Sequence, residues 1–479
     1  MATLIVQKPL KEILPVGQDV IFTVSNNTIV QNETRVKFIA EVHISSGNPV
    51  NLSTNNDLVG TFKTTPNDAG VGMFDFAPII ESFVNADNKA RFGSAYKGIV
   101  NTLDFSCPIH LVDKFSGNID TFRYLAIVFR IEYLGANATY PDSVNIDTGE
   151  DKNSDEYQVF NGYLKYENEL KLVGNDFGFD VEDKFAFRYF GGVYSTANFL
   201  SNAPTTQYAN LEDYGTFGML MSSPWSSSNP TGSTHIELNY FGSTGAYLGT
   251  EDIYHSAANG AFAYPTSDIV AQMLFVGIFP ANLQGDGTTM FAGLVTAGTI
   301  QGGYYTLAVI SDFGVLSEVY TINLNCPTQK GYEPIRLTWL NQWGAWDYYT
   351  FNMKSTKTIS TKGSTYRQLQ GTWNKSSYKI DSFKGGKKAF RVNATEKIKM
   401  NTDFVSEAES EWFEDLINSP EVYILEGFQD DTVNSALNNY VTPVRLTTSS
   451  YTKKTVANDK LMQYTFEVEK SKTLRTQSV

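Results

Sequence analysis

Short runs in which apolar and polar residues alternate recur along this chain, and turn-forming residues separate them. Every second residue is apolar between Arg35 and Ile44, and the same alternation returns from Met462 to Val468. A side-chain period of two places apolar residues on one face of a β-strand. The chain also contains 32 Phe and 27 Tyr, residues that suit a pleated, half-buried surface. The sequence therefore predicts a mainly β fold of antiparallel sandwiches or barrels with few short helices.

The length of the chain indicates several domains, because 479 residues exceed what one hydrophobic core supports. We expect a β domain at 1–165, a middle β domain with long loops at 166–328, and a C-terminal β domain with one helix at 329–479. No Lys or Arg lies between Arg188 and Lys330. That gap sets the middle region apart in composition and favours its assignment as a separate domain.

The charge of the chain excludes the usual nucleic-acid binding proteins. Residues 1–328 carry 16 Lys and Arg against 34 Asp and Glu, residues 329–479 carry 21 against 17, and the net charge is −14. Phosphate binding needs a basic surface, so we expect no nucleic-acid partner. We also expect no secretion signal and no membrane insertion. Cys107 and Cys326 are interpreted as buried free thiols of a protein made in a reducing cytoplasm, with a disulfide as the alternative.

The third region carries the clearest local signals. Two apolar runs, 335–341 and 346–353, flank Gly344, and this predicts a hairpin whose turn uses a positive φ. Ser406 and Glu409 form a capping-box pattern that predicts the start of a helix, and Pro420 ends it.

Catalytic and metal-binding patterns are missing from the sequence. The four histidines, His43, His110, His235 and His255, lack zinc-ligand spacing, and no nucleophile elbow, P-loop or dinucleotide fingerprint occurs. His43 falls within an alternating run, which favours a packed or sheet-surface histidine over a catalytic one. We therefore expect a non-enzymatic protein without cofactor or metal.

Two groups of carboxylates could contradict that expectation. Asp176, Asp180, Glu182 and Asp183 could include a glycosidase pair, but acidic residues at strand ends and in loops are usually solvated, and this interpretation is favoured. Hard oxygen ligands for calcium occur in the acidic segment 142–156, which we interpret as a solvent loop or domain connection. They are Asp147, Glu150, Asp151 and Asp155.

Aromatic residues around the predicted hairpin and helix are candidates for packing and assembly. Such residues also stack on sugars, but at strand positions they more often form cores and interfaces. The candidates are Trp339, Trp343, Gly344, Trp346, Tyr348, Trp412 and Phe413. Nearby, the basic stretch Lys384, Lys387, Lys388 and Arg391 is either a solvated loop or a contact with an acidic neighbouring subunit.

Three segments of the third region carry a resemblance to a known family. They are EPIRLTWLNQWGAWDYYTFNMK with Tyr366, Gly371 and Trp373 behind it, EWFEDLINSPEVYIL, and TPVRLTTSSYTKKTVANDKLMQYTFEVEKS. Together they resemble a C-terminal module of tail-associated virion proteins of phages that infect Bacteroidetes, and FDFAPIIESFV fits the same proteins more loosely. The resemblance implies a structural virion role and carries over no catalytic residue.

These observations lead to one expected function and two alternatives. We expect a structural component of a tailed-phage virion, in the tail, baseplate or collar, that forms a cyclic homo-oligomer and contacts other virion proteins. The third region would mediate assembly and the middle region would present loops, so that residues 200–325 could be deleted without loss of assembly. The alternatives are an adhesin for a host surface glycan or receptor, and a depolymerase.

Overall fold

The protein is described from a computed structural model. The structure describes residues 3–47, 50–52, 56–89, 108–112, 115–118, 120–134, 144–146, 151–187, 189–190, 193–194, 197–221, 235–254, 272–284, 289–311, 314–325, 331–372, 374–426, 441–453, 462–472 and 474–475. Cys107, Cys326, His255 and Trp373 lie outside these ranges.

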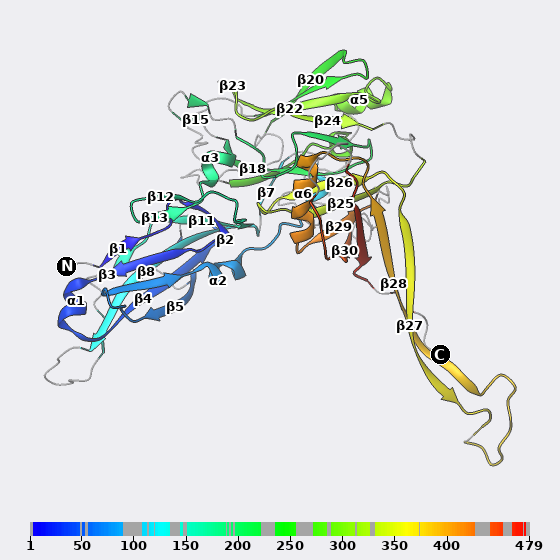
Figure 1. Ribbon diagram of the computed structural model, residues 1–479, viewed down its shortest axis with the longest axis horizontal. Coiled ribbons are helices and arrows are strands. Elements are labelled where there is room, and N and C mark those ends of the chain that lie inside the picture. The colour runs from blue at the N-terminus through cyan, green and yellow to red at the C-terminus, as the bar shows by residue number, and fades with distance from the viewer. Residues whose placement is uncertain are drawn as a thin grey trace. The chain divides into compact units, whose positions relative to one another are not determined.

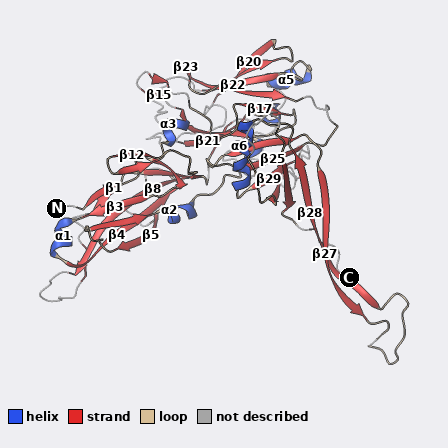
Figure 2. Cartoon of the chain, in the orientation of Figure 1, coloured by secondary structure: helices blue, strands red, loops and turns tan. Residues whose placement is uncertain are grey.

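Mainly β architecture is confirmed. The described residues form seven sheets and six short α-helices, and none of the sheets closes into a barrel (Figure 2). Most strand pairs are antiparallel, as predicted, and three pairs are parallel: β2 with β11, β14 with β18, and β17 with β24. No helix among the described residues is long and apolar enough to cross a membrane.

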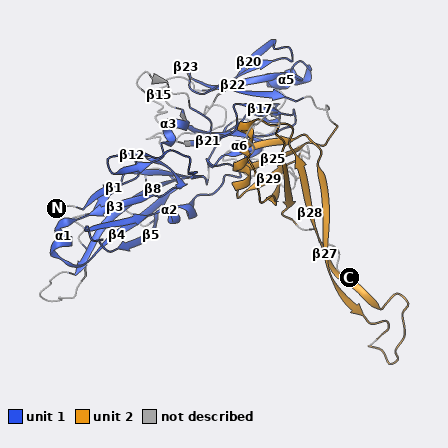
Figure 3. Cartoon of the chain, viewed as in Figure 1, with its two compact units in different colours: residues 1–325, 340–347 blue, residues 326–339, 348–479 orange. Residues whose placement is uncertain are grey.

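The chain divides into two compact units, where the sequence predicted three regions (Figure 3). Unit 1 comprises 1–325 and 340–347, and unit 2 comprises 326–339 and 348–479. The border near 325 lies close to the predicted border at 328/329. The predicted border at 165/166 falls inside unit 1, because strand β7 (Phe115–Gly117) of the first region pairs with strand β21 (Gln272–Gly277) of the middle region.

The N-terminal part of unit 1 contains two sheets around a shared core. The smaller sheet has the order β1-β3-β6 and consists of β1 (Leu4–Gln7), β3 (Ile21–Ser25) and β6 (Val71–Asp75). The larger sheet has the order β2-β11-β8-β4-β5, with β9 and β10 also paired to β8. Its strands are β2 (Ile13–Gly17), β4 (Thr34–Ser45), β5 (Leu58–Thr64), β8 (Phe122–Leu134), β9 (Val144–Ile146), β10 (Lys152–Asn153) and β11 (Tyr157–Tyr163).

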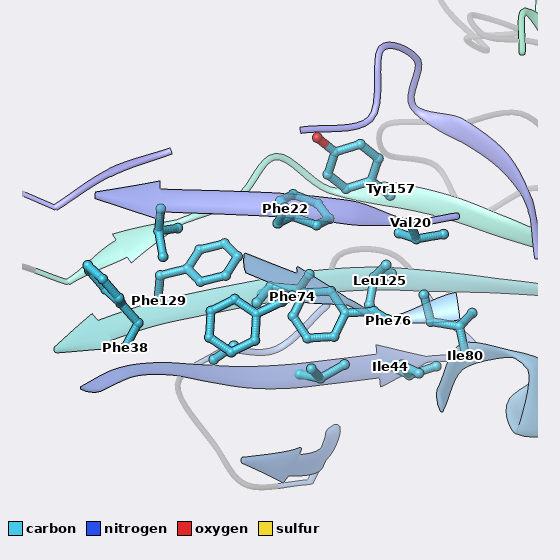
Figure 4. Packing of buried hydrophobic residues seen from close by; sticks show 14 of the residues in the cluster. Val20, Phe22, Phe38, Ile44, Phe74, Phe76, Ile80, Leu125, Phe129 and Tyr157 are labelled. Atoms are coloured by element: carbon cyan, nitrogen blue, oxygen red, sulfur yellow. The ribbon is translucent and has the colours of Figure 1, made fainter. Parts of the chain in front are cut away.

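Aromatic side chains from both sheets fill the core between them (Figure 4). Phe22 on β3 meets Phe129 on β8 at 5.7 Å between ring centroids and Tyr157 on β11 at 5.5 Å. The alternating residues of β4 point into this core, as predicted, and Phe38, Ala40 and Val42 are fully buried there. The acidic segment 142–156 is not wholly a solvent loop, because β9 and β10 within it pair with β8.

The middle part of unit 1 contains the two further sheets that position the candidate sites. The four-stranded sheet has the order β14-β18-β21-β7, with β14 (Ala186–Phe187) and β18 (Thr216–Met221). The six-stranded sheet has the order β17-β24-β22-β19-β20, with β23 paired to β22. Its strands are β17 (Thr206–Ala209), β19 (His235–Phe241), β20 (Tyr247–Tyr254), β22 (Tyr304–Ser311), β23 (Gly314–Val315) and β24 (Tyr320–Leu324).

The remaining elements of unit 1 are short. Two small hairpins pair β12 (Lys171–Val173) with β13 (Asp176–Gly178), and β15 (Tyr189–Phe190) with β16 (Val193–Tyr194). The helices are α1 (Asn27–Asn32), α2 (Ala77–Ile80), α3 (Val181–Phe185), α4 (Pro280–Gln284) and α5 (Met290–Thr296), with single 3-10 turns at Glu81–Phe83 and Ile109–Leu111.

Unit 2 is built on one eight-stranded sheet and one helix. The sheet order is β26-β25-β29-β30-β31-β28-β27, with β32 paired to β28. The strands are β25 (Ile335–Leu340), β26 (Trp346–Phe351), β27 (Thr356–Gln368), β28 (Gly386–Asn401), β29 (Val422–Leu425), β30 (Val441–Leu446), β31 (Thr465–Lys470) and β32 (Leu474–Arg475). Helix α6 (Glu407–Asn418) has the predicted Ser406–Glu409 capping box.

Candidate functional site

The seven residues predicted for packing or assembly are all buried within the chain. The structure brings them together as two groups. Trp343, Gly344 and Trp346 belong to the hairpin tip, residues 340–347, which packs within unit 1. Trp339, Tyr348, Trp412 and Phe413 belong to unit 2. Their role in assembly stays a prediction, and burial limits it to shaping surfaces that other residues present.

Trp343 is the centre of the hairpin tip. Its ring lies 4.5 Å from the ring of Phe185 and 5.5 Å from that of Phe179 between centroids, and the Lys184 ammonium lies 5.2 Å above it. The indole Nε1–H donates to Asn202 Oδ1 at 3.0 Å. A buried tryptophan is thus packed on both apolar and cationic neighbours while its one donor is satisfied.

The backbone of the hairpin tip is held by an asparagine and a glycine. Asn341 Oδ1 accepts from the backbone N–H groups of Trp343 and Ala345, as asparagine does in local turns. Gly344 has a φ of +73°, as the sequence predicted, and a Cβ added there would lie 2.3 Å from the carbonyl oxygen of Asn161. No other residue type fits this position without a shift of the Asn161 backbone.

The aromatic group of unit 2 packs helix α6 onto its sheet. The rings of Trp339 and Trp412 are 5.0 Å apart, and those of Tyr349 and Phe413 are 4.9 Å apart. Burial raises the pKa of Tyr349 far above its ordinary value, so its hydroxyl stays protonated. This group stabilises the fold of unit 2 and leaves no aromatic face of the helix open.

The strands β27 and β28 with the segment between them, residues 356–401, form the candidate assembly surface, which we call the arm. The two strands pair from Thr356↔Lys399 to Gln368↔Gly386. Within the described residues, only the part of β28 from 393 to 401 pairs with β31 and β32. The rest of the arm is a two-stranded ribbon (Figure 1). Such a ribbon is marginally stable in water on its own.

The arm exposes large apolar side chains. Six of them are more than half exposed: Ile359, Leu369, Tyr378, Ile380, Phe383 and Phe390. Phe390 is the extra residue of a β-bulge, because Ser364 pairs with Arg391 and Thr365 with Ala389. Bulges redirect side chains and interrupt pairing. Exposed apolar groups gathered on one element mark an interaction surface.

The arm is also the most basic part of the chain. It holds 11 Lys and Arg against two Asp and Glu, a net charge of +9, so the rest of the chain carries −23. Lys362, Arg367, Lys379 and Lys387 form no ion pair with any residue that the structure describes. The sequence located part of this surface through Lys384, Lys387, Lys388 and Arg391, but not its strand structure.

One carboxylate is fixed by a lysine at the base of the arm. Lys397 Nζ lies 3.1 Å from Glu467 Oε1, and Thr447 Oγ1 donates to the same oxygen at 3.0 Å. These hydrogen bonds, that of Lys397 first, lower the pKa of Glu467 below its ordinary value. Glu467 therefore links β28 to β31 as a charged group.

Two of the carboxylates that could form a glycosidase pair, Asp180 and Asp183, lie in an ion-pair network with Lys11 and Lys171. Asp180 Oδ2 is 2.8 Å from Lys11 Nζ, and Lys171 Nζ is 3.3 Å from Asp183 Oδ2. Burial alone would raise the pKa of Asp180, but the hydrogen bonds from Lys11 and from the Asp183 N–H outweigh it, and the pKa is lowered. A general acid needs the opposite shift, and the expectation that the protein is not an enzyme stays a prediction.

The calcium candidates do not converge where the structure describes them. Asp147 and Glu150 lie outside the described residues. Asp151 pairs with Arg130 at 3.3 Å and Asp155 pairs with Lys8. Each of these two carboxylates is therefore already compensated by a cation.

Among the described residues, one group could offer three ligand atoms to a metal: His235, Glu237 and Asp252, whose ligand atoms lie within 4.8 Å of one another. His235 Nε2 is 3.7 Å from Asp252 Oδ1. Sequence spacing missed the group because Asp252 comes from the neighbouring strand β20. The expectation that the protein has no metal site stays a prediction. His43, by contrast, is buried on β4, and its burial lowers its pKa, so it packs as a neutral ring.

Comparison with known proteins yields no family. No family model matches the chain, and no curated protein matches it. Among solved structures, trypsin-activated α-2-macroglobulin from Escherichia coli is similar over 84% of this chain and 19% of its own, with 8% identity and a TM-score of 0.17. The native conformation of E. coli α-2-macroglobulin is similar over 83% of this chain and 22% of its own, with 9% identity and a TM-score of 0.16. Similarity at this level defines neither fold nor function.

Proposed function

We propose that the protein is a structural subunit of a tailed-phage virion, in the tail, baseplate or collar, that assembles with copies of itself and with neighbouring virion proteins. The arm is the observation that carries the assembly part of this proposal. The virion setting rests on the resemblance of the three segments in 333–471 to tail-associated proteins.

The energetics of the arm favour a partner that is acidic. Completing the burial of its six half-exposed apolar side chains contributes on the order of 5–10 kcal/mol. Association costs about 4–15 kcal/mol in lost motion, so apolar burial alone is not enough. Attraction between the arm, at +9, and the remainder of another copy, at −23, adds affinity and sets orientation.

Contact between the arm of one copy and a different surface of the next is a heterologous interface. Repeated around an axis, such an interface closes into a ring. Discrete closed oligomers are therefore expected for the purified chain.

Native mass spectrometry of the full chain at micromolar concentration tests the charge contribution. K362E/K387E reverses two exposed cations of the arm, and K152E/K472E reverses two exposed cations outside it. We expect a closed oligomer for the wild type and the control pair, and mainly monomer for the arm pair. High salt should dissociate the wild type in the same way.

The apolar contribution is tested by a second matched pair. I380S/F383S removes two exposed apolar side chains of the arm, and L172S/V173S removes two on β12. Only the arm variant should dissociate. A wild type that is monomeric in solution, and whose I380S/F383S variant enters phage particles as well as the wild type does, would overturn the proposal. Immunoelectron microscopy of particles tests the virion setting separately.

A further inference from the structure

The six-stranded sheet of unit 1 has one buried face and one open face. Alternate residues of β19 and β22, among them Ile236, Leu238, Tyr240 and Leu307, are fully buried on the inner face. Tyr305 on the same face donates from its hydroxyl to the Ile278 carbonyl at 2.7 Å. The residues between them lie on the outer face and are half-buried, except Ala308, which is buried.

An aromatic row crosses this outer face. Cross-strand pairing places one residue from each of five strands side by side: Tyr208, Asn323, Tyr304, Phe241 and Tyr247. The rings of Phe241 and Tyr304 stack at 4.8 Å with an angle of 12°, and Tyr247 meets Phe241 at 5.8 Å. The two ends of the row, Tyr208 and Tyr247, are 59% and 61% exposed.

A polar row runs beside the aromatic row, two residues away on four strands and three residues away on β20, where the pairing register shifts. It consists of Thr206, Thr321, Thr306, Asn239 and Thr250. Hydrogen bonds connect its end into a chain: Tyr247 OH and Thr250 Oγ1 are 2.5 Å apart, Thr250 Oγ1 donates to Asn239 Oδ1 at 2.5 Å, and Asn239 Nδ2 donates to Glu237 at 2.8 Å. These side chains are therefore held in place before any ligand arrives.

The charge on this face limits what it can bind. Glu237 and Asp252 lie beside the polar row, and the sequence from 189 to 329 contains no Lys or Arg to offset them. An anionic polymer would be repelled. The face suits a neutral or amine-bearing ligand that has both apolar surfaces and many hydroxyl groups.

We propose that the outer face of this sheet binds a carbohydrate chain built from neutral or amino sugars. The aromatic row supplies flat surfaces for the apolar faces of sugar rings. The polar row and Glu237 supply donors and acceptors for hydroxyl groups. Five strands about 4.8 Å apart give a track of roughly 19 Å, long enough for several linked rings. This proposal is independent of the arm and of the assembly that the arm mediates.

The first experiment is a glycan array probed with the full chain, followed by titration of the best neutral or amino-sugar glycan. The wild type should bind saturably. Y208A and Y247A should each weaken binding about tenfold or more, because each removes an exposed end of the aromatic row. Y166A is the matched control, since Tyr166 is a fully exposed tyrosine outside the sheet, and it should bind like the wild type.

Two results would overturn the proposal: binding to no neutral or amino-sugar glycan, or binding that Y208A and Y247A leave unchanged. Binding only to anionic glycans would also contradict it. Because both tyrosines are exposed, their variants should fold, and unchanged unfolding midpoints check this. K362E/K387E should keep the affinity of each site for a soluble oligosaccharide, which separates this proposal from that of assembly.

Discussion

Two hairpins of one sheet differ in burial: the end of one is buried and the end of the other is exposed. The β25–β26 hairpin ends in the tip 340–347, where every residue is buried. The β27–β28 hairpin forms the arm, whose outer part is exposed on both faces. The first is rich in Trp and Tyr, and the second in Lys, Thr and Ser. Side chains, rather than hairpin geometry, decide whether such an element completes a core or remains available to a partner.

The comparison predicts its largest difference in the free energy of unfolding between variants of Trp343 in the buried hairpin tip and of Phe383 on the exposed arm. W343A should lower the free energy of unfolding by about 3–5 kcal/mol, because it opens a cavity against Phe179 and Phe185. F383A on the arm should change it by less than about 0.5 kcal/mol, since Phe383 is 73% exposed. Chemical denaturation of both variants measures the difference. Similar losses for the two would break the distinction between the hairpins.

A glycine in each hairpin gives the next effect. Gly344 and Gly386 have nearly the same φ, +73° and +75°, but a Cβ would meet the Asn161 carbonyl at Gly344 and open space at Gly386. The left-handed conformation alone costs a non-glycine residue roughly 1–2 kcal/mol. G386A should show that cost and G344A should exceed it. Equal unfolding free energies would mean that the Asn161 backbone adjusts freely.

The smallest expected effect lies at the base of the arm. Glu467 has a lowered pKa in the folded chain, so its contribution to stability is present above its ordinary pKa of 4.5 and is lost as pH falls through the lowered value. E467Q should therefore show less loss of stability than the wild type over that acidic range. Unfolding midpoints between pH 3 and 7 measure it, with E411Q on the exposed side of α6 as the control. A wild-type pH profile in E467Q would contradict the assignment.

Much of the local structure was predictable from the sequence. Alternation located β4 and β31, and the capping box located α6. The positive φ at Gly344 followed from its place between two apolar runs. Each of these signals depends on residues that are near one another in the chain.

The non-local arrangement could not be predicted. Nothing in the sequence links Trp343 to Asn202, or Trp346 to the Asp87 carbonyl that its indole contacts at 2.8 Å. Leu200 and Asn202 also contact the hairpin tip within unit 1, through Asn341 Nδ2 and Trp343 Nε1. The expectation that residues 200–325 can be deleted without loss of assembly stays a prediction. The aromatic row was also invisible, because it requires β17 and β24 to pair in parallel across more than a hundred residues.

The late position of the hairpin tip in the chain has a consequence for synthesis. Trp343 and its neighbours complete a core that includes Phe179, Phe185 and Asn202, so unit 1 cannot finish folding until residue 347 has left the ribosome. At about 5–20 residues per second, the 162 residues that follow Phe185, up to residue 347, take roughly 8–32 s to synthesise. A nascent chain that has not yet reached residue 347 leaves this aromatic site open. Chaperones can bind the open site, and the hairpin tip must then displace them.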